Sequence, residues 1–217
     1  MEQKNFGTAE ELYQFVHLAL HDVEPPARPD FVYLFGQTAD NAERSLDLGA
    51  EAGKAGIPVG ILDCPPYAGY GGVAAWKDGL LRRGVPGEKI ILLRHIPLRG
   101  NPAPNTCAEA SALVQFAKEH GIRVLLIVAP ALHIVRAALT AIRAVLREYP
   151  ELRVYFRTAA LYDWTGGRIL HSQGIAEGTR LELLRGEFER LERYCTQGDV
   201  ASLPEAIRYV VSRDAAS

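Results

Sequence analysis

His133 and Arg136 are the two side chains whose types and spacing best suit chemistry, because they stand three residues apart just after Pro130. In a helix, residues three apart share one face. An imidazole can act as a general acid or base, and a guanidinium can clamp an anion through two hydrogen bonds. A helix beginning after Pro130 adds the partial positive charge of its N-terminus. We therefore take both as candidate catalytic residues, although the same pattern also fits a helix whose polar face happens to hold them.

An apolar run directly precedes this pair. Residues 123–129 lie between Gly121 and Pro130 and are typical of a fully buried parallel strand. Ligands of α/β proteins bind beyond the carboxyl ends of such strands. The expected strand therefore ends where His133 and Arg136 begin their helix.

The rest of the chain alternates between short β-rich runs and longer helical patterns. Further strands are expected at 31–36, 57–63, 89–94 and 152–157, and helices at about 8–23, 39–55, 73–83, 106–120, 131–148, 178–194 and 203–212. This alternation predicts a doubly wound, mostly parallel α/β sheet of about five strands with helices on both faces. We expect a single α/β domain over 1–217, with its core at about 30–160 and a C-terminal helical extension at about 176–217.

Two of the expected helices carry specific signals. Thr8 and Glu11 have the spacing of a capping box at the start of the first helix. In the helix over 178–194 an apolar stripe predicts packing against the core, and an outward pair of charges four residues apart predicts a solvated face. The stripe comprises Leu181, Leu184, Phe188 and Leu191, and the charged pair comprises Glu189 and Arg193.

Composition argues against several classes of protein. The chain has 217 residues, 48% of them hydrophobic, and a formal net charge of -2 without a basic cluster, so nucleic acid is not an expected partner. Its 3 cysteines lack the spacing of a thiolate metal site or a disulfide framework, and no metal is expected. No apolar run reaches about 18 residues and the start lacks a signal-peptide core, which predicts a cytoplasmic protein without membrane insertion.

Two strand ends offer candidate ligand-binding residues. Gly36, Gln37 and Thr38 follow the first strand, but a dinucleotide site needs three glycines where this chain has one, so NAD is not an expected cofactor. Asp63 ends the second strand, where a carboxylate can hold a ribose diol. Asp63 also fits a turn carboxylate before Pro65.

Asn105 and Thr106 are further candidate ligand-binding residues, at the start of the helix over 106–120. Thr106 and Glu109 have capping-box spacing, which would explain Thr106 without a ligand. Asn105 then stands one place before the cap, where it fits either a ligand contact or a turn. Because parallel strands end at one edge of the sheet, we expect Gly36, Asn105, His133 and Arg136 to converge there.

The loop over 158–177 follows the last strand and contains Tyr162, Asp163 and Trp164. Loops of this length in compact domains commonly serve as lids or binding loops.

Together, these motifs resemble the family grouped as ElyC/SanA/YdcF, and the C-terminal region is most similar to the YdcF branch. The resemblance covers about residues 30–200. It rests on Gly36, Gly56-Ile57-Pro58, Gly84-Val85-Pro86 with Lys89-Ile90, Asn105-Thr106 with Glu109-Ala110, His133 with Arg136-Ala137, Gly186-Glu187, Arg190-Leu191 and Gly198-Asp199. The chain departs from the family pattern at Asp63-Cys64, where a glycine pair is common, and near Pro130, where a serine is common.

The resemblance implies a Rossmann-like fold. It links the YdcF branch to S-adenosylmethionine binding, and ElyC and SanA to maintenance of the cell envelope.

Two functions follow as expectations. One is a small-molecule binding protein, with or without catalysis, that holds a nucleoside-type ligand such as S-adenosylmethionine between the loop at 36–38, Asp63 and the His133–Arg136 pair. The other is a hydrolase or transferase acting on a phosphorylated or sugar-containing envelope precursor. In the second, Arg136 clamps the anion and His133 is the general acid or base.

Overall fold

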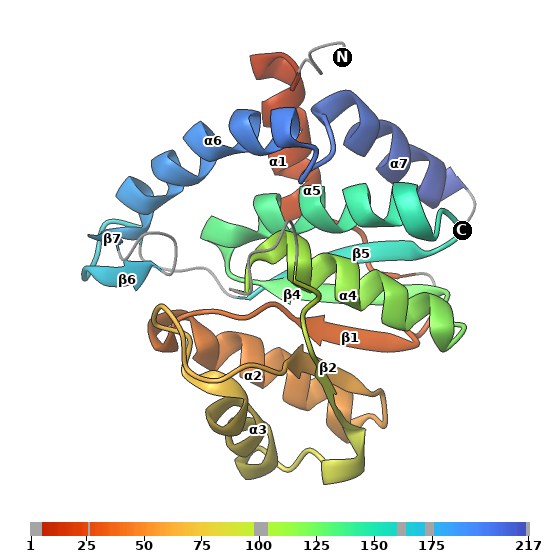
Figure 1. Ribbon diagram of the computed structural model, residues 1–217, viewed down its shortest axis with the longest axis vertical. Coiled ribbons are helices and arrows are strands. Elements are labelled where there is room, and N and C mark those ends of the chain that lie inside the picture. The colour runs from red at the N-terminus through yellow and green to blue at the C-terminus, as the bar shows by residue number, and fades with distance from the viewer. Residues whose placement is uncertain (1–5, 26, 98–103, 160–163, 172–175, 216–217) are drawn as a thin grey trace.

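The predicted doubly wound sheet is confirmed. A computed structural model describes residues 6–25, 27–97, 104–159, 164–171 and 176–215. Five parallel strands stand in the order β3-β2-β1-β4-β5, with helices on both faces (Figure 1). The strands are β1 Phe31–Leu34, β2 Val59–Leu62, β3 Ile90–Leu93, β4 Val124–Ala129 and β5 Arg153–Thr158.

The central strands are buried on both faces, which explains their nearly continuous apolar sequences. Every residue of β1 is buried, and its side chains alternate between two separate clusters of the core. Phe31 and Tyr33 enter one cluster, while Val32 and Leu34 enter the other. This is the two-residue period that a pleated strand requires when both of its faces are covered.

The helices divide between the two faces. Their bounds are α1 Ala9–Leu20, α2 Ala39–Lys54, α3 Gly72–Arg82, α4 Thr106–Glu119, α5 Ala131–Glu148, α6 Arg180–Gln197 and α7 Leu203–Ala215, with a short 3-10 helix at Gly87–Lys89. Apolar residues of α2 and α3 cover one face, and those of α4 and α5 cover the other. α1, α6 and α7 pack against α5, which is therefore buried on most sides (Figure 1).

Among the described helices, none combines the length and the hydropathy that crossing a bilayer requires.

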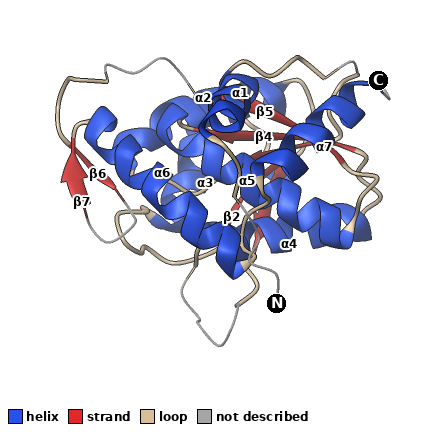
Figure 2. Ribbon diagram, turned by 90° about the horizontal axis from the view of Figure 1, so that it is seen from above, coloured by secondary structure: helices blue, strands red, loops and turns tan. Residues whose placement is uncertain are grey.

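The loop expected over 158–177 contains a small hairpin that the sequence did not predict. β6 Ile169–His171 and β7 Ala176–Gly178 pair in antiparallel fashion. Strands of three residues are too short for a visible alternation of apolar and polar residues. Seen from above, the hairpin lies at one end of the molecule beside the start of α6 (Figure 2).

The two helix signals read from the sequence had different outcomes. The capping box on α1 is confirmed, because Thr8 and Glu11 exchange both of its hydrogen bonds. The apolar stripe on α6 is confirmed in part: Leu191 is buried, and Leu184 and Phe188 pack against the core, but Leu181 is 54% exposed. The fully buried residues of the helix are Leu183, Glu187, Leu191 and Cys195. On the solvent side, Arg185 rather than Arg193 pairs with Glu189. The helix is rotated because a carboxylate on it faces inward toward a buried arginine.

Candidate functional site

The strand order places the switch point of the sheet between β1 and β4. These neighbours pair in register up to Leu34 and Val128, after which the chain turns to opposite faces of the sheet. α2 follows β1 onto one face, and α5 follows β4 onto the other. In open α/β sheets, ligands bind where the connections diverge in this way. The loop at 36–38 and the start of α5 lie at this switch point.

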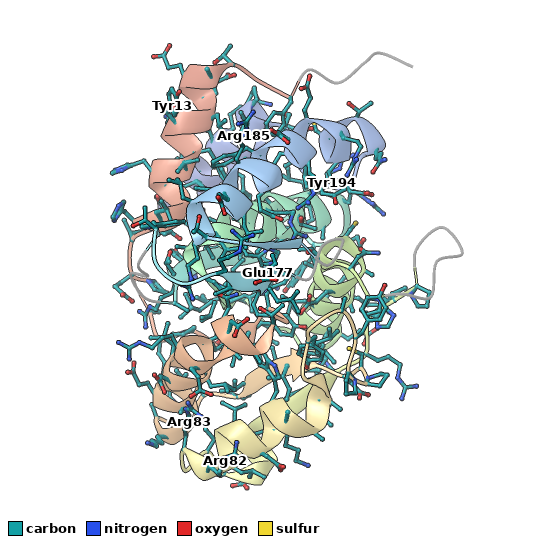
Figure 3. The ribbon with its side chains drawn as sticks, turned by 90° about the vertical axis from the view of Figure 1, so that its left-hand side faces the viewer. Tyr13, Arg82, Arg83, Glu177, Arg185 and Tyr194 are labelled. Carbon is teal, nitrogen blue, oxygen red and sulfur yellow. The ribbon has the colours of Figure 1, made fainter. Side chains whose placement is uncertain are left out.

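The β6–β7 hairpin extends over the same end of the sheet. Figure 3 looks onto the side of the molecule where the hairpin lies and shows Glu177 of β7 near the middle of the view. The Leu170 amide donates to Asp40 Oδ2 at 3.2 Å, at the start of α2. Ile169 packs in an apolar cluster with Leu132 at the start of α5 and Leu183 of α6. The hairpin therefore connects the beginnings of α2 and α5, the helices that follow β1 and β4. Tyr162 and Asp163 lie outside the described residues.

Glu109 is a central polar residue of the site, although the sequence pattern predicted only a capping role for it. Its Oε1 atom accepts hydrogen bonds from Tyr33 Oη at 2.8 Å and from the Gly36 amide at 2.9 Å. Burial raises the pKa of the Glu109 carboxyl to about 7, while the two hydrogen bonds and the charge of Arg136 act in the opposite direction. Glu109 therefore ties α4 to the loop that follows β1.

The expected capping box of Thr106 and Glu109 is wrong by one residue. Asn105 is the N-cap of α4, and its side chain accepts from the Ala108 amide at 2.9 Å. Thr106 is already helical, and its hydroxyl accepts from Nη1 of Arg136. Because the helix begins one position earlier than expected, Glu109 faces the sheet. The capping role expected of Thr106 is performed by Asn105 instead.

Arg136 and His133 lie in the predicted place but are enclosed. Arg136 is 4% exposed, and its Nε donates to Glu187 Oε2 at 2.5 Å. His133 is 2% exposed, with Nδ1 3.8 Å from the same carboxylate oxygen. The second oxygen of Glu187 accepts from Arg190 at 3.1 Å. An anion approaching Arg136 would therefore compete with Glu187.

The candidates on the β1–α2 loop are also shielded. Gln37 and Thr38 are buried, and Thr38 Oγ1 accepts from Asn41 Nδ2 at 3.0 Å. The Oδ1 atom of Asn41 is buried and accepts no hydrogen bond from any described residue. This leaves a free acceptor beside the loop. Buried polar atoms without partners are uncommon in proteins, and ligands are one source of the missing bond.

Asp63 is more accessible than those loop residues. It directly follows β2, and its side chain is 30% exposed. Arg94 lies 3.7 Å from its carboxylate, a distance and exposure at which an ion pair contributes little. The Asp63 carboxylate can therefore accept hydrogen bonds from a polar molecule at the edge of the sheet.

Hydrogen bonds place Gly36, Asn105 and Arg136 at the same edge of the sheet, as expected, but Arg136 and His133 are enclosed there by internal partners rather than open to a ligand. Gly36 bonds to Glu109, and Thr106 of the same helix bonds to Arg136. Asn105 caps that helix one residue earlier. Asp63 stands at the end of the neighbouring strand β2 and, among the described residues, makes no hydrogen bond with this group. Sequence reasoning missed Tyr33 and Glu187, although a tyrosine in a buried strand signals a hydroxyl that needs a partner.

A pocket of about 200 Å³ lies elsewhere, on the α2 side of the sheet. Val32, Val128 and Leu48 contribute to its aliphatic lining, and Glu24 and Arg157 line it while bonded to each other. It includes none of the residues predicted for the site.

Comparison with protein-family models and with curated proteins finds no match for this chain.

Proposed function

We propose that this protein binds a nucleoside-type small molecule, such as S-adenosylmethionine, at the carboxyl edge of the sheet between β1 and β4. The observation that carries the proposal is the strand order, which makes β1 and β4 the point where connections diverge to opposite faces. Ligand sites in open α/β sheets occur at this point because the ends of the loops leave a crevice there.

The polar groups at this edge of the sheet favour a ligand with a ribose. Asp63 lies at the end of β2, next to β1, and its partly exposed carboxylate is a suitable acceptor for a diol. Asn41 Oδ1 offers a second acceptor beside Thr38. The motif resemblance to the YdcF branch supports the choice of an adenosyl compound.

A dinucleotide is disfavoured by the same loop. Gln37 and Thr38 carry buried side chains where a pyrophosphate needs bare backbone. We expect titration with NADH to give no saturable binding, and a micromolar dissociation constant would contradict this part of the proposal.

The hydrolase or transferase alternative has weaker support. It needs Arg136 to clamp an anion, and the guanidinium already bonds to Glu187 and Thr106. Release of phosphate or sugar from an envelope precursor, lost in a His133→Ala variant, would favour this alternative over simple binding.

A thermal-shift screen over adenosyl compounds, nucleotides and sugar phosphates tests the proposal. A ligand at about 100 times its dissociation constant stabilises the folded state by roughly 2.7 kcal/mol. For a responding adenosyl compound, calorimetry on Asp63→Asn should show weaker binding because a ribose acceptor is lost. Asp78→Asn, the same change at an exposed site on α3, is the matched control. Equal affinities of the two variants, or no response to any adenosyl compound, would contradict the proposal.

A further inference from the structure

The main chain after β1 changes its hydrogen-bond partner between Phe35 and Gly36. The Phe35 amide still donates to Val128 of β4 at 3.0 Å. The next amide, that of Gly36, donates instead to Glu109 Oε1. At Gly36, where the chain turns toward α2, the hydrogen-bond acceptor is therefore the Glu109 side chain rather than a strand carbonyl.

The carboxylate is fixed from two directions. Tyr33 Oη, from within β1, donates to the oxygen that also binds the Gly36 amide. A Cβ atom placed on Gly36 would lie 3.6 Å from Glu109 Oε1 and 3.2 Å from Leu62, so the loop backbone fits closely against its surroundings. Movement of the Glu109 carboxyl should therefore change the hydrogen bond and the position of the Gly36 amide.

We propose that Glu109 is a positioning residue for the β1–α2 loop, and that gain of a proton by its carboxyl weakens the hold on Gly36. Hydrogen bonds to an ionised acceptor are roughly twice as strong as those between neutral groups. The consequence for ligand binding rests on the proposed function; the consequence for Gly36 does not.

Among the groups that interact electrostatically with Glu109, Glu109 is the one expected to change charge near neutral pH. Tyr33 on β1, Tyr70 in the turn before α3 and Cys64 after β2 interact electrostatically with it. Burial raises the pKa of each of these three groups, that of Cys64 to about 11, so they stay neutral near pH 7. Arg136 on α5 supplies a positive charge. The pKa of Glu109 itself, about 7, places its change of charge near neutral pH.

Nuclear magnetic resonance of protein labelled with nitrogen-15 at glycine tests this without any ligand. The Gly36 signal is identified by its loss in Gly36→Ala, and its amide proton shift is followed between about pH 5.5 and 8.5. We expect one titration with a midpoint near pH 7, moving to the shift of a stronger hydrogen bond as pH rises. Glu109→Gln should abolish the titration. Glu119→Gln, the same change at the exposed end of α4, should preserve it.

Two results would overturn the proposal. One is a Gly36 shift that does not change near pH 7 in the wild type. The other is a titration that persists in Glu109→Gln, which would assign it to another group.

A second variant keeps the test decisive if Glu109→Gln does not fold. Tyr33→Phe removes a hydrogen bond that lowers the Glu109 pKa, so the Gly36 midpoint should rise. An unchanged midpoint would contradict the proposal. Failure of S-adenosylmethionine to bind, with Gly36 titrating as expected, would count against the proposed function and still support the role of Glu109.

Discussion

Arg136 on α5 and Glu187 on α6 form a buried ion pair, with Nε and Oε2 2.5 Å apart and side chains 4% and 3% exposed. Such a pair pays a large desolvation cost, which its mutual attraction and its other hydrogen bonds offset. Thr106 and Arg190 supply those additional bonds. The pair links the helix that follows β4 to the helix that follows the hairpin.

Loss of one partner should therefore destabilise the fold strongly. Arg136→Ala leaves Glu187 buried beside a cavity, and we expect a loss of about 3–5 kcal/mol in the free energy of unfolding by urea. Arg136→Met combined with Glu187→Leu should recover much of this loss because no buried charge is left at the pair. A loss below about 1 kcal/mol for the single variant would show that the pair is dispensable.

Two neighbouring residues at the start of α4 have different roles: Asn105 caps the helix, and Thr106 accepts a hydrogen bond from Arg136. Asn105→Ala removes the N-cap acceptor for the Ala108 amide and should cost about 1 kcal/mol. Thr106→Val removes the hydroxyl that accepts from Arg136, a bond to a charged group worth about 1.5–3 kcal/mol. Urea midpoints measure both, with Thr8→Ala at the cap of α1 as the comparison for a pure cap. A larger cost for Asn105→Ala than for Thr106→Val would contradict the assignment.

Glu109 should make stability fall as pH rises. Its folded pKa of about 7 lies above the ordinary value of 4.5, so the native state holds more protons than the unfolded state between these values. Its contribution is then present in full below about pH 4.5 and lost by about pH 7, with a total near 3 kcal/mol.

Urea unfolding of wild type and Glu109→Gln at about pH 5 and pH 8 isolates this effect. Other titrating groups contribute equally to both proteins and cancel in the comparison. The wild type should lose more stability between the two pH values than the variant does. Equal losses would mean that the Glu109 carboxyl titrates alike in the folded and unfolded states.

The sequence predicted the framework better than the contacts that join its parts. The apolar run of β4 and the helical period of α5 are local signals, and both elements formed where expected. Glu109 was misread as a cap and Glu187 was missed because their partners lie far away in the chain, 73 residues for Gly36 and 51 for Arg136. Local spacing places a carboxylate on a helix face but does not say which charge or amide the fold brings to it.

Two leucines of α6 lie in opposite environments, and substituting each of them tests how the β6–β7 hairpin is held in place. Leu183 is 8% exposed and packs with Ile169 of β6 and Leu132 of α5, whereas Leu181 is 54% exposed. Leu183→Ala should cost about 2 kcal/mol and speed hydrogen exchange of the β6–β7 amides, since it opens the cluster that holds the hairpin to the edge of the sheet. Leu181→Ala should change the free energy of unfolding by less than about 0.5 kcal/mol and leave that exchange unaltered. If Leu181→Ala were the more damaging change, Leu181 rather than Leu183 would face the core, as the sequence predicted.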